Sequence, residues 1–239
     1  MINYSYYRNY NSSKTIVLLH GWGVNSSYME SLKDFLLEDY SILLLDLPGH
    51  GKSYLNKVYK IEDYVDELFY IVNKEKITSL YGIGHSFGGK ILGMYAKKYP
   101  LDGGILIAPS LIKPRFSLSL FIKIRIYKIL RKLKLKIPKC LQGSYDYRNS
   151  SGLKRETFLN VHKAYLNKKE LNKIKTKFIV IGFTKDKSIN VYQVRRLNKY
   201  LLNSKLFIYE GNHFGYFSYF KEIRILLTYL TRGENDLFV

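Results

Sequence analysis

The sequence predicts an α/β fold with one mostly parallel sheet and helices on both of its faces. Two observations predict it: short runs of Ile, Val and Leu end at turn residues, and stretches with helical spacing separate these runs. Apolar runs without alternation are typical of strands covered on both faces, and strands that alternate with helices imply right-handed crossovers. With 239 residues, of which 46% are hydrophobic, the chain is long enough to bury a substantial core.

Strands and helices can be placed along the chain by these two patterns. Six apolar runs are expected as parallel strands: Thr15–Leu19, Ser41–Leu45, Leu80–Ile83, Gly104–Ala108, Lys177–Ile181 and Lys205–Tyr209. Helical spacing predicts helices at Met29–Glu38, Ile61–Val72, Gly88–Tyr99, Val191–Leu201 and Tyr219–Leu230. The Tyr-rich, alternating segment Met1–Tyr10 is expected to add an antiparallel strand at the edge.

The alternation of strands and helices fails between Leu111 and Glu170, where the apolar spacing is helical and no clean strand is found. We therefore expect a first part of the core at residues 1–110, a helical cap insert at 111–170, and a second part of the core at 171–239. The insert holds 16 Lys and Arg against 3 Asp and Glu, so it carries most of the chain's net charge of +20. This local excess indicates either an acidic partner or a solvated basic face.

The amino-terminal segment and the cysteine content both favour the cytoplasm. Residues Met1–Arg8 lack the basic-then-apolar layout of a signal peptide, and no stretch approaches the roughly 18 apolar residues of a spanning helix. Cys140 is the only cysteine, which excludes an intramolecular disulfide and a cysteine-based zinc cluster. We therefore expect a cytoplasmic protein.

A serine flanked by glycines lies where the third parallel strand should meet its helix. Gly84-His85-Ser86-Phe87-Gly88 has the pattern G-x-S-x-G in the strand-to-helix context that a nucleophile elbow requires. Small flanking residues allow the tight, strained turn that lifts a serine hydroxyl above the sheet. The alternative is a glycine-rich turn with a surface serine. A dinucleotide motif fails at Phe87, and a phosphate-binding loop ending at Gly51-Lys52-Ser53 fails at Asp46.

A candidate acid and a candidate base follow the last two expected strands. Asp186 and His213 both lie at the carboxyl ends of strands, where open α/β sheets place their sites. A serine nucleophile needs a base that accepts its proton, and the base needs a carboxylate that fixes its tautomer. The chain order serine, acid, histidine also fits this architecture. We predict Ser86, Asp186 and His213 as a catalytic triad; the alternatives are a solvated loop carboxylate and a turn histidine.

The first parallel strand runs into a glycine-rich loop, His20-Gly21-Trp22-Gly23. Glycines there let the backbone approach a ligand and turn its N–H groups inward. The backbone N–H groups of Trp22 and Phe87 are the predicted oxyanion-hole donors, and the Trp22 side chain is expected to line the pocket as a substrate-binding residue. Serine, histidine, aspartate and two backbone donors suffice for this chemistry, so no cofactor and no metal are expected.

Together these segments resemble the α/β-hydrolase family over nearly the whole chain. The motifs that carry the resemblance are HGWG at His20–Gly23, DLPGHGKS at Asp46–Ser53, GHSFGG at Gly84–Gly89, the Asp186 loop and GNHFG at Gly211–Gly215. The resemblance implies the α/β-hydrolase fold and a serine esterase that hydrolyses carboxylic esters through an acyl-serine intermediate. It also implies a supporting role for Asp46 and His50, and Ser86 at the elbow disfavours an aspartate nucleophile.

The segment His20–Asn25 is similar to the oxyanion segment of the pimeloyl-[acyl-carrier-protein] methyl ester esterases of biotin synthesis. This resemblance implies a methyl ester on an acyl chain that an acyl carrier protein holds. Carrier proteins are acidic, and a cationic cap would steer one toward the pocket mouth. The basic residues expected in the cap are Lys113, Arg115, Lys123, Arg125, Lys128, Arg131, Lys132, Lys134, Lys136, Arg148, Lys154 and Arg155.

Other functions stay open at this point. Residues Phe116–Ile137 interleave apolar and basic side chains, as interfacial helices do, which would suit a lipid or lysophospholipid esterase at a membrane surface. A generic carboxylesterase, a menaquinone-pathway lyase of the same fold and a non-catalytic binding module are further alternatives. The sequence has no zinc motif or recognition helix that would indicate nucleic-acid binding.

Overall fold

The computed structural model describes residues 2–115, 118–138, 141 and 143–232. Cys140 and the first two residues of the segment Phe116–Ile137 lie outside the described part of the chain. None of the described helices combines the length and the apolar character needed to cross a membrane.

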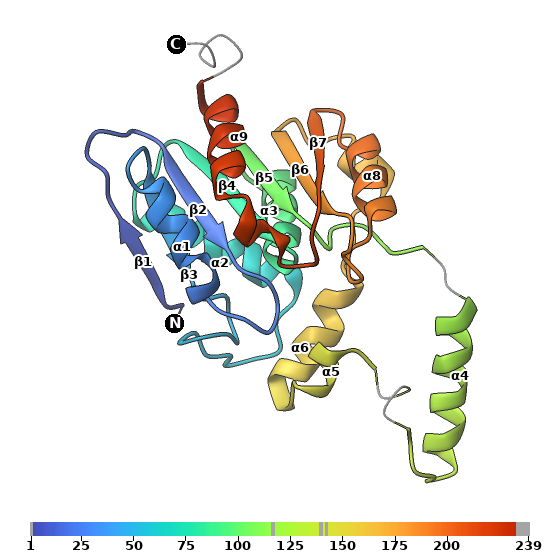
Figure 1. Ribbon diagram of the computed structural model, residues 1–239. Helices are drawn as coiled ribbons and strands as arrows, with labels where there is room; N and C mark the ends of the chain where they lie inside the picture. Colours follow the sequence, from blue (N-terminus) through green and yellow to red (C-terminus); the bar gives the residue numbers. More distant parts are fainter. Residues whose placement is uncertain (1, 116–117, 139–140, 142, 233–239) are drawn as a thin grey trace.

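A seven-stranded sheet lies at the centre of the described residues, in the order β1-β3-β2-β4-β5-β6-β7 (Figure 1). Its strands are β1 (Tyr4–Tyr7), β2 (Thr15–Leu19), β3 (Ser41–Leu45), β4 (Leu80–His85), β5 (Gly103–Ile107), β6 (Lys177–Phe183) and β7 (Ser204–Tyr209). β1 pairs antiparallel with β3, and the other pairs are parallel. The predictions of a mostly parallel sheet and of an antiparallel edge strand near the amino terminus are confirmed.

The parallel strands form from segments that are apolar on both faces. β2, β3 and β5 are buried at every position. β4 runs two residues further than expected, through His85, and its pairing with β5 continues to that residue. Gly82 and Gly84 conceal this extension in the sequence, because glycine is disfavoured in strand interiors. The longer strand brings the edge of the sheet directly to Ser86.

Five of the described helices cover the sheet: α1 (Ser27–Leu36), α2 (Ile61–Lys74), α3 (Phe87–Lys98), α8 (Val191–Tyr200) and α9 (Phe220–Arg232). α1 packs against α9 on one face of the sheet, and α2 packs against α3 on the other (Figure 1). All five predicted helices are confirmed, and their ends differ by two residues at most. α1 begins earlier than expected because Ser27 and Tyr28 are exposed and do not enter the apolar pattern.

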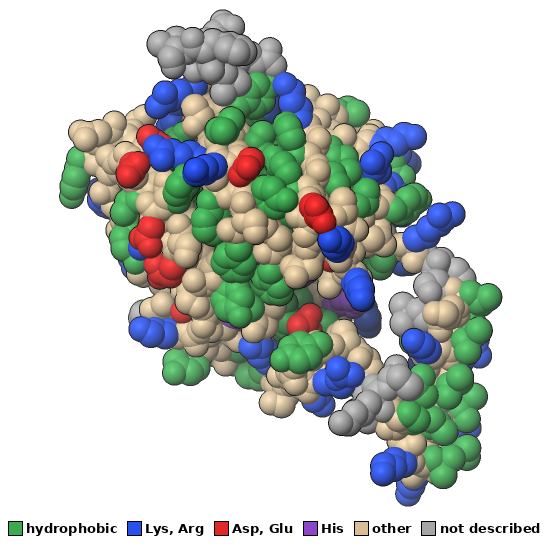
Figure 2. All heavy atoms as spheres, in the orientation of Figure 1, with side chains coloured by type: hydrophobic (Ala, Val, Ile, Leu, Met, Phe, Trp, Pro, Cys, Tyr) green, Lys and Arg blue, Asp and Glu red, His purple; other side chains and the backbone are tan. Residues whose placement is uncertain are grey.

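Helices fill the described part of the segment between β5 and β6. They are α4 (Leu118–Lys132), α5 (Tyr145–Arg148), α6 (Gly152–Lys163) and α7 (Lys168–Leu171), and the described residues here contain no strand. α5 and α6 lie below the sheet in Figure 1, whereas α4 stands apart from the rest of the molecule. Figure 2 shows hydrophobic side chains along α4 beside Lys and Arg, and the sequence of α4 has no acidic residue.

A carboxylate holds the turn that follows β3. Asp46 accepts hydrogen bonds from the N–H groups of Ser26 and Lys52, both at 2.9 Å, and from the Asn3 side chain at 3.0 Å. Burial alone would raise the pKa of Asp46, but these bonds outweigh burial and lower the pKa. Asp46 therefore ties the chain before β1 and the start of α1 to the end of β3, the supporting role expected of it.

Candidate active site

Ser86 occupies a strained turn between β4 and α3. Its backbone has φ 53° and ψ −106°, a conformation that residues other than glycine rarely adopt. The Ser86 N–H donates to the Ile107 carbonyl at 2.8 Å, and the Ser86 carbonyl accepts from the N–H groups of Lys90 and Ser110, both at 3.1 Å. These bonds hold the strained turn in place, so the hydroxyl has a defined position at the end of β4.

The glycines on either side of Ser86 are required by close approach of the backbone. A Cβ on Gly84 would lie 2.6 Å from the backbone of Gly88, and a Cβ on Gly88 would strike the carbonyl of Leu19. Neither contact can be relieved by moving a flexible side chain, because the atoms that each added Cβ would strike belong to the backbone. The G-x-S-x-G pattern is therefore a packing requirement of the β4–α3 junction.

His213 and Asp186 form a hydrogen-bonded pair from two different loops. His213 Nδ1 lies 2.7 Å from Asp186 Oδ2, and the Asp186 side chain is fully buried. The other carboxylate oxygen accepts the N–H groups of Ser188 and Ile189 at 2.7 and 2.9 Å. Because the ionised carboxylate only accepts, Nδ1 carries the proton in this pair and Nε2 is left as a free acceptor. This is the tautomer that a general base facing a serine requires.

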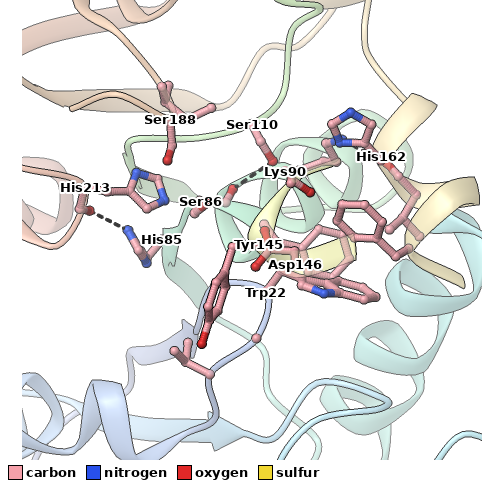
Figure 3. Close-up of a pocket in the computed structure, with 18 of the residues that line it drawn as sticks. Trp22, His85, Ser86, Lys90, Ser110, Tyr145, Asp146, His162, Ser188 and His213 are labelled. Carbon is pink, nitrogen blue, oxygen red and sulfur yellow. Dashed lines mark hydrogen bonds between the residues drawn. The ribbon is translucent and has the colours of Figure 1, made fainter. Parts of the chain in front are cut away.

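Ser86 and His213 line one cavity of about 520 Å³, and Asp186 is joined to this site by its hydrogen bond to His213. Ser86 lies beside the His213 imidazole in this cavity (Figure 3). The described residues contain no hydrogen bond between the Ser86 hydroxyl and His213, and in unliganded enzymes that bond is often long. The three residues predicted as a triad are thus brought to one place from the β4–α3 turn and from the loops after β6 and β7.

His20 fixes the orientation of the Gly21–Trp22 peptide. Its Nε2 accepts the Leu47 N–H at 3.0 Å, so its proton is on Nδ1, which donates to the Gly21 carbonyl at 2.7 Å. A trans peptide points its C=O and its N–H in opposite directions, so this bond turns the Trp22 N–H away from His20. Among the described residues the Trp22 N–H has no acceptor, which leaves it available to a ligand. This role of His20 is not evident from the sequence.

The second predicted donor, the Phe87 N–H, begins helix α3. The first N–H groups of a helix have no intrahelical partner, and they carry the positive end of the helix dipole. In the described part of the chain this N–H also finds no acceptor. The Trp22 and Phe87 rings pack with their centroids 5.2 Å apart, so both donors come from neighbouring residues next to Ser86.

Apolar rings from the core and from α6 form much of the cavity wall. Trp22 contacts Phe87 on one side and Phe158 of α6 on the other, each with a centroid distance of 5.2 Å. Tyr145 and Asp146 of α5 also line the cavity, and burial raises the pKa of Asp146. The segment between β5 and β6 therefore supplies one wall of the cavity, and Trp22 lines it as expected.

His85, whose role is not evident from the sequence, supports the loop that carries His213. Its Nε2 lies 2.8 Å from the backbone carbonyl of His213, and the two rings are 4.7 Å apart. Burial, together with the nearby His213, lowers the pKa of His85 to about 3, so the ring is neutral and its Nε2–H donates to that carbonyl. The residue before the nucleophile thus positions the loop that carries the candidate base.

The fold is expected to lose stability as the pH falls below about 6.5. This loss begins at a higher pH than the titration of most carboxylates. Burial lowers the pKa of His20 to about 4, and it lowers the pKa of His50 and of His85 to about 3. The unfolded chain binds protons at these residues below about pH 6.5 and the folded chain does not, so the free energy of unfolding falls as the pH drops. Each histidine contributes a slope of up to about 1.4 kcal/mol per pH unit.

Urea unfolding between about pH 7.5 and about pH 5 measures this slope. The variant His50→Gln removes one titrating group, and it is expected to reduce the slope by up to about a third whatever it does to stability at neutral pH. A free energy of unfolding that stays constant over this range in the wild type would contradict the prediction.

Comparisons with known proteins agree with the observed fold. A family model described as alpha/beta hydrolase fold matches residues 14–125. The structure superposes on an esterase from Exiguobacterium antarcticum with a TM-score of 0.74 at 19% identity, covering 96% of this chain and 95% of that one. A lipase-esterase related protein from Clostridium acetobutylicum gives a TM-score of 0.73 at 21% identity, covering 96% and 99%. The chain has the α/β-hydrolase fold, and the predicted fold class is confirmed.

Relatives in sequence match a smaller part of the chain. A probable serine hydrolase of Drosophila melanogaster is 38% identical over 91 residues, which are 36% of this chain and 28% of that protein. A pimeloyl-[acyl-carrier protein] methyl ester esterase of Shewanella woodyi is 39% identical over 98 residues, 40% of this chain and 36% of that protein. The matched segments thus span between 28% and 36% of the length of these relatives. These matches confirm the resemblance to serine hydrolases and to pimeloyl-[acyl-carrier protein] methyl ester esterases.

Proposed function

We propose that this chain is a serine hydrolase of carboxylic esters that forms an acyl-serine intermediate. The observation that supports the proposal most is that Ser86 and His213 line one cavity, with Asp186 hydrogen-bonded to His213. Two backbone N–H groups that have no acceptor among the described residues lie beside Ser86. Nucleophile, base, orienting acid and oxyanion donors are the complete set that acyl transfer requires.

In the first half-reaction, the Ser86 Oγ attacks the ester carbonyl while His213 Nε2 accepts the hydroxyl proton. The carbonyl oxygen becomes negatively charged, and the N–H groups of Trp22 and Phe87 donate to it. Collapse of this tetrahedral species breaks the bond to the alcohol, which leaves with the proton that His213 returns. The product of this half-reaction is an acyl ester of Ser86.

In the second half-reaction, water attacks the acyl-serine and His213 accepts one of its protons. The carboxylic acid leaves, and the Ser86 oxygen recovers a proton from His213. Two backbone N–H groups and the imidazole all donate to Asp186, so its carboxylate keeps a fixed position during both half-reactions. Its task is to hold His213 in one tautomer and to stabilise the imidazolium that forms in each half-reaction.

A panel of p-nitrophenyl esters of graded acyl length tests this reaction. We expect p-nitrophenol and the free acid in equal amounts, with highest activity on acyl chains that the cavity of about 520 Å³ can enclose. A binding module or a lyase specific for another bond would leave the whole panel unhydrolysed. That result, obtained with folded protein, would contradict the proposal.

A second candidate is more specific: hydrolysis of a methyl ester on an acyl chain held by an acyl carrier protein. Relatives that carry this name in Shewanella woodyi and Proteus mirabilis support it. Lys128, Arg131 and Lys132 are exposed on α4, in a segment with few acidic residues, and could attract an acidic protein. In this candidate, residues 111–170 act as the cap over the cavity.

The carrier candidate predicts faster hydrolysis of methyl pimeloyl-carrier protein than of free methyl pimelate. Changing Lys128, Arg131 and Lys132 together to Glu should lower kcat/KM for the carrier-bound ester and leave that for a p-nitrophenyl ester unchanged. A matched control changes Lys173, Lys175 and Lys177, three exposed residues at and just before the start of β6, to Glu. Equal losses in both triple variants would contradict carrier docking on α4.

A further inference from the structure

The cavity contains a buried lysine that the proposed reaction does not use. Lys90 lies one helical turn after Ser86 in α3, and it is only 2% exposed. Its Nζ donates to the Val161 carbonyl at 2.9 Å and lies 4.4 Å from the centre of the Tyr165 ring. Lys90 also lines the cavity that holds Ser86 (Figure 3).

None of these neighbours carries a negative charge. Among the described residues Lys90 forms no ion pair, whereas Lys97 on the same helix pairs with Glu170. The bond to Val161 ties α6 to α3, a structural task that takes only one of the three ammonium N–H groups. A buried cation without a counter-ion is unfavourable, and an apolar side chain would fill the same space without this penalty. A negatively charged part of a ligand would remove the penalty.

The chemistry of the site determines which part of an ester meets Lys90. His213 returns its proton to the leaving alcohol, so the alcohol must lie on the His213 side of Ser86. Figure 3 shows Lys90, with Ser110 and His162, on the opposite side of Ser86. The acyl part of the substrate therefore extends toward Lys90.

We propose that Lys90 binds a carboxylate at the far end of the acyl chain, which makes half-esters of short dicarboxylic acids the substrate class. This inference rests on the proposed ester hydrolysis and narrows its substrate. Lys90 follows Ser86 by about one helical turn of 5.4 Å, so only a short chain fits between the ester and the carboxylate. The inference favours a free half-ester over a carrier-bound methyl ester, whose far end is an uncharged thioester.

The test compares monomethyl glutarate with methyl 5-methylhexanoate, in which an isopropyl group replaces the carboxylate. For the wild type, kcat/KM should be about tenfold to a hundredfold higher for the half-ester, the range expected of a charged hydrogen bond. Lys90→Met should bring the ratio close to equality and still hydrolyse the neutral ester. Lys97→Met, on an exposed face of the same helix, should keep the wild-type ratio.

The ratio should also depend on pH. Burial lowers the pKa of Lys90 to about 7. The titratable groups that face it are His162 and Tyr165; burial lowers the pKa of His162 and raises that of Tyr165, so both are uncharged near neutral pH. The preference for the half-ester should therefore be larger at about pH 6 than at about pH 8.5. Lys90→Arg should keep the preference at the higher pH, because a guanidinium stays charged.

The outcomes separate this inference from the proposed function. Equal kcat/KM values for the two esters in the wild type, or an unchanged ratio in Lys90→Met, would overturn the role of Lys90 and leave ester hydrolysis intact. Failure of the folded wild type to hydrolyse either ester would overturn the proposed function itself. If Lys90→Met does not fold, the wild-type ratio, its pH dependence and Lys90→Arg still decide.

Discussion

Replacing Ser86 with alanine is expected to lower kcat for a p-nitrophenyl ester by about 10⁴-fold to 10⁶-fold, with little change in KM. The hydroxyl is the atom that would become acylated, and no neighbouring group can replace it in that role. Fold stability should rise slightly or stay the same, because alanine removes no hydrogen bond that the backbone of residue 86 makes. Steady-state kinetics with purified variant and wild type measure the effect.

A matched control is Ser188→Ala, a second serine that lines the same cavity. Its described link to the site is through its backbone N–H, which donates to Asp186 and which alanine retains. We expect this variant to keep most of the wild-type kcat. If Ser86→Ala kept its activity while Ser188→Ala lost it, Ser86 could not be the nucleophile.

Changing Asp186 to asparagine is expected to lower kcat by about 10³-fold to 10⁴-fold. An asparagine amide group would donate to His213 and favour the tautomer with its proton on Nε2, which cannot accept the Ser86 proton. The amide oxygen can still accept the N–H groups of Ser188 and Ile189, so the loop should keep its shape. The loss should therefore appear in kcat and not in thermal stability.

The comparison variant is Asp146→Asn, which alters a carboxyl that lines the cavity itself. Asp146 lies on α5, and the described residues show no hydrogen bond from it to His213. We expect this variant to change kcat by less than about tenfold. A larger loss in Asp146→Asn than in Asp186→Asn would move the acid of the triad to α5.

The sheet and its covering helices could be predicted because strands that are buried on both faces appear in the sequence as uninterrupted apolar runs. β2 and β3 have the expected bounds, since every one of their residues is apolar or buried. The carboxyl end of β4 was not predicted because Gly82 and Gly84 weaken the strand pattern in the sequence. Both positions are glycine because α3 packs closely against them. Such a tertiary contact is not visible in the sequence pattern of the strand itself.

The candidate triad could be proposed from the sequence because chain order and loop position strongly restrict which residues can form it. Asp102, the residue before β5, accepts hydrogen bonds from Ser79 and from the Leu80 N–H at the amino end of β4, away from Ser86, and so cannot serve as the acid. The pairing of His213 with Asp186 and the burial of that carboxylate required coordinates, since both depend on how two separate loops meet.

The supporting residues were beyond the reach of sequence reasoning. His20 and His85 act through particular ring nitrogens that donate to backbone carbonyls, and a sequence does not reveal a tautomer or its partner. The sequence alone indicates that Lys90 is a polar residue on an amphipathic helix. Only the packing of α6 over Lys90 shows that its side chain is buried. The bounds of α4 to α7 were also unpredicted, because that segment lacks regular alternation with strands.

The central claim is that Ser86 is a nucleophile activated by His213, and covalent trapping tests it most directly. Wild-type protein is treated with a fluorophosphonate, digested and analysed by peptide mass spectrometry, with His213→Ala treated in parallel. We predict a single phosphonyl adduct on Ser86 in the wild type and a rate of labelling at least about a hundredfold lower in His213→Ala. An unlabelled wild type, an adduct on another residue, or equal labelling rates in the two proteins would contradict the claim.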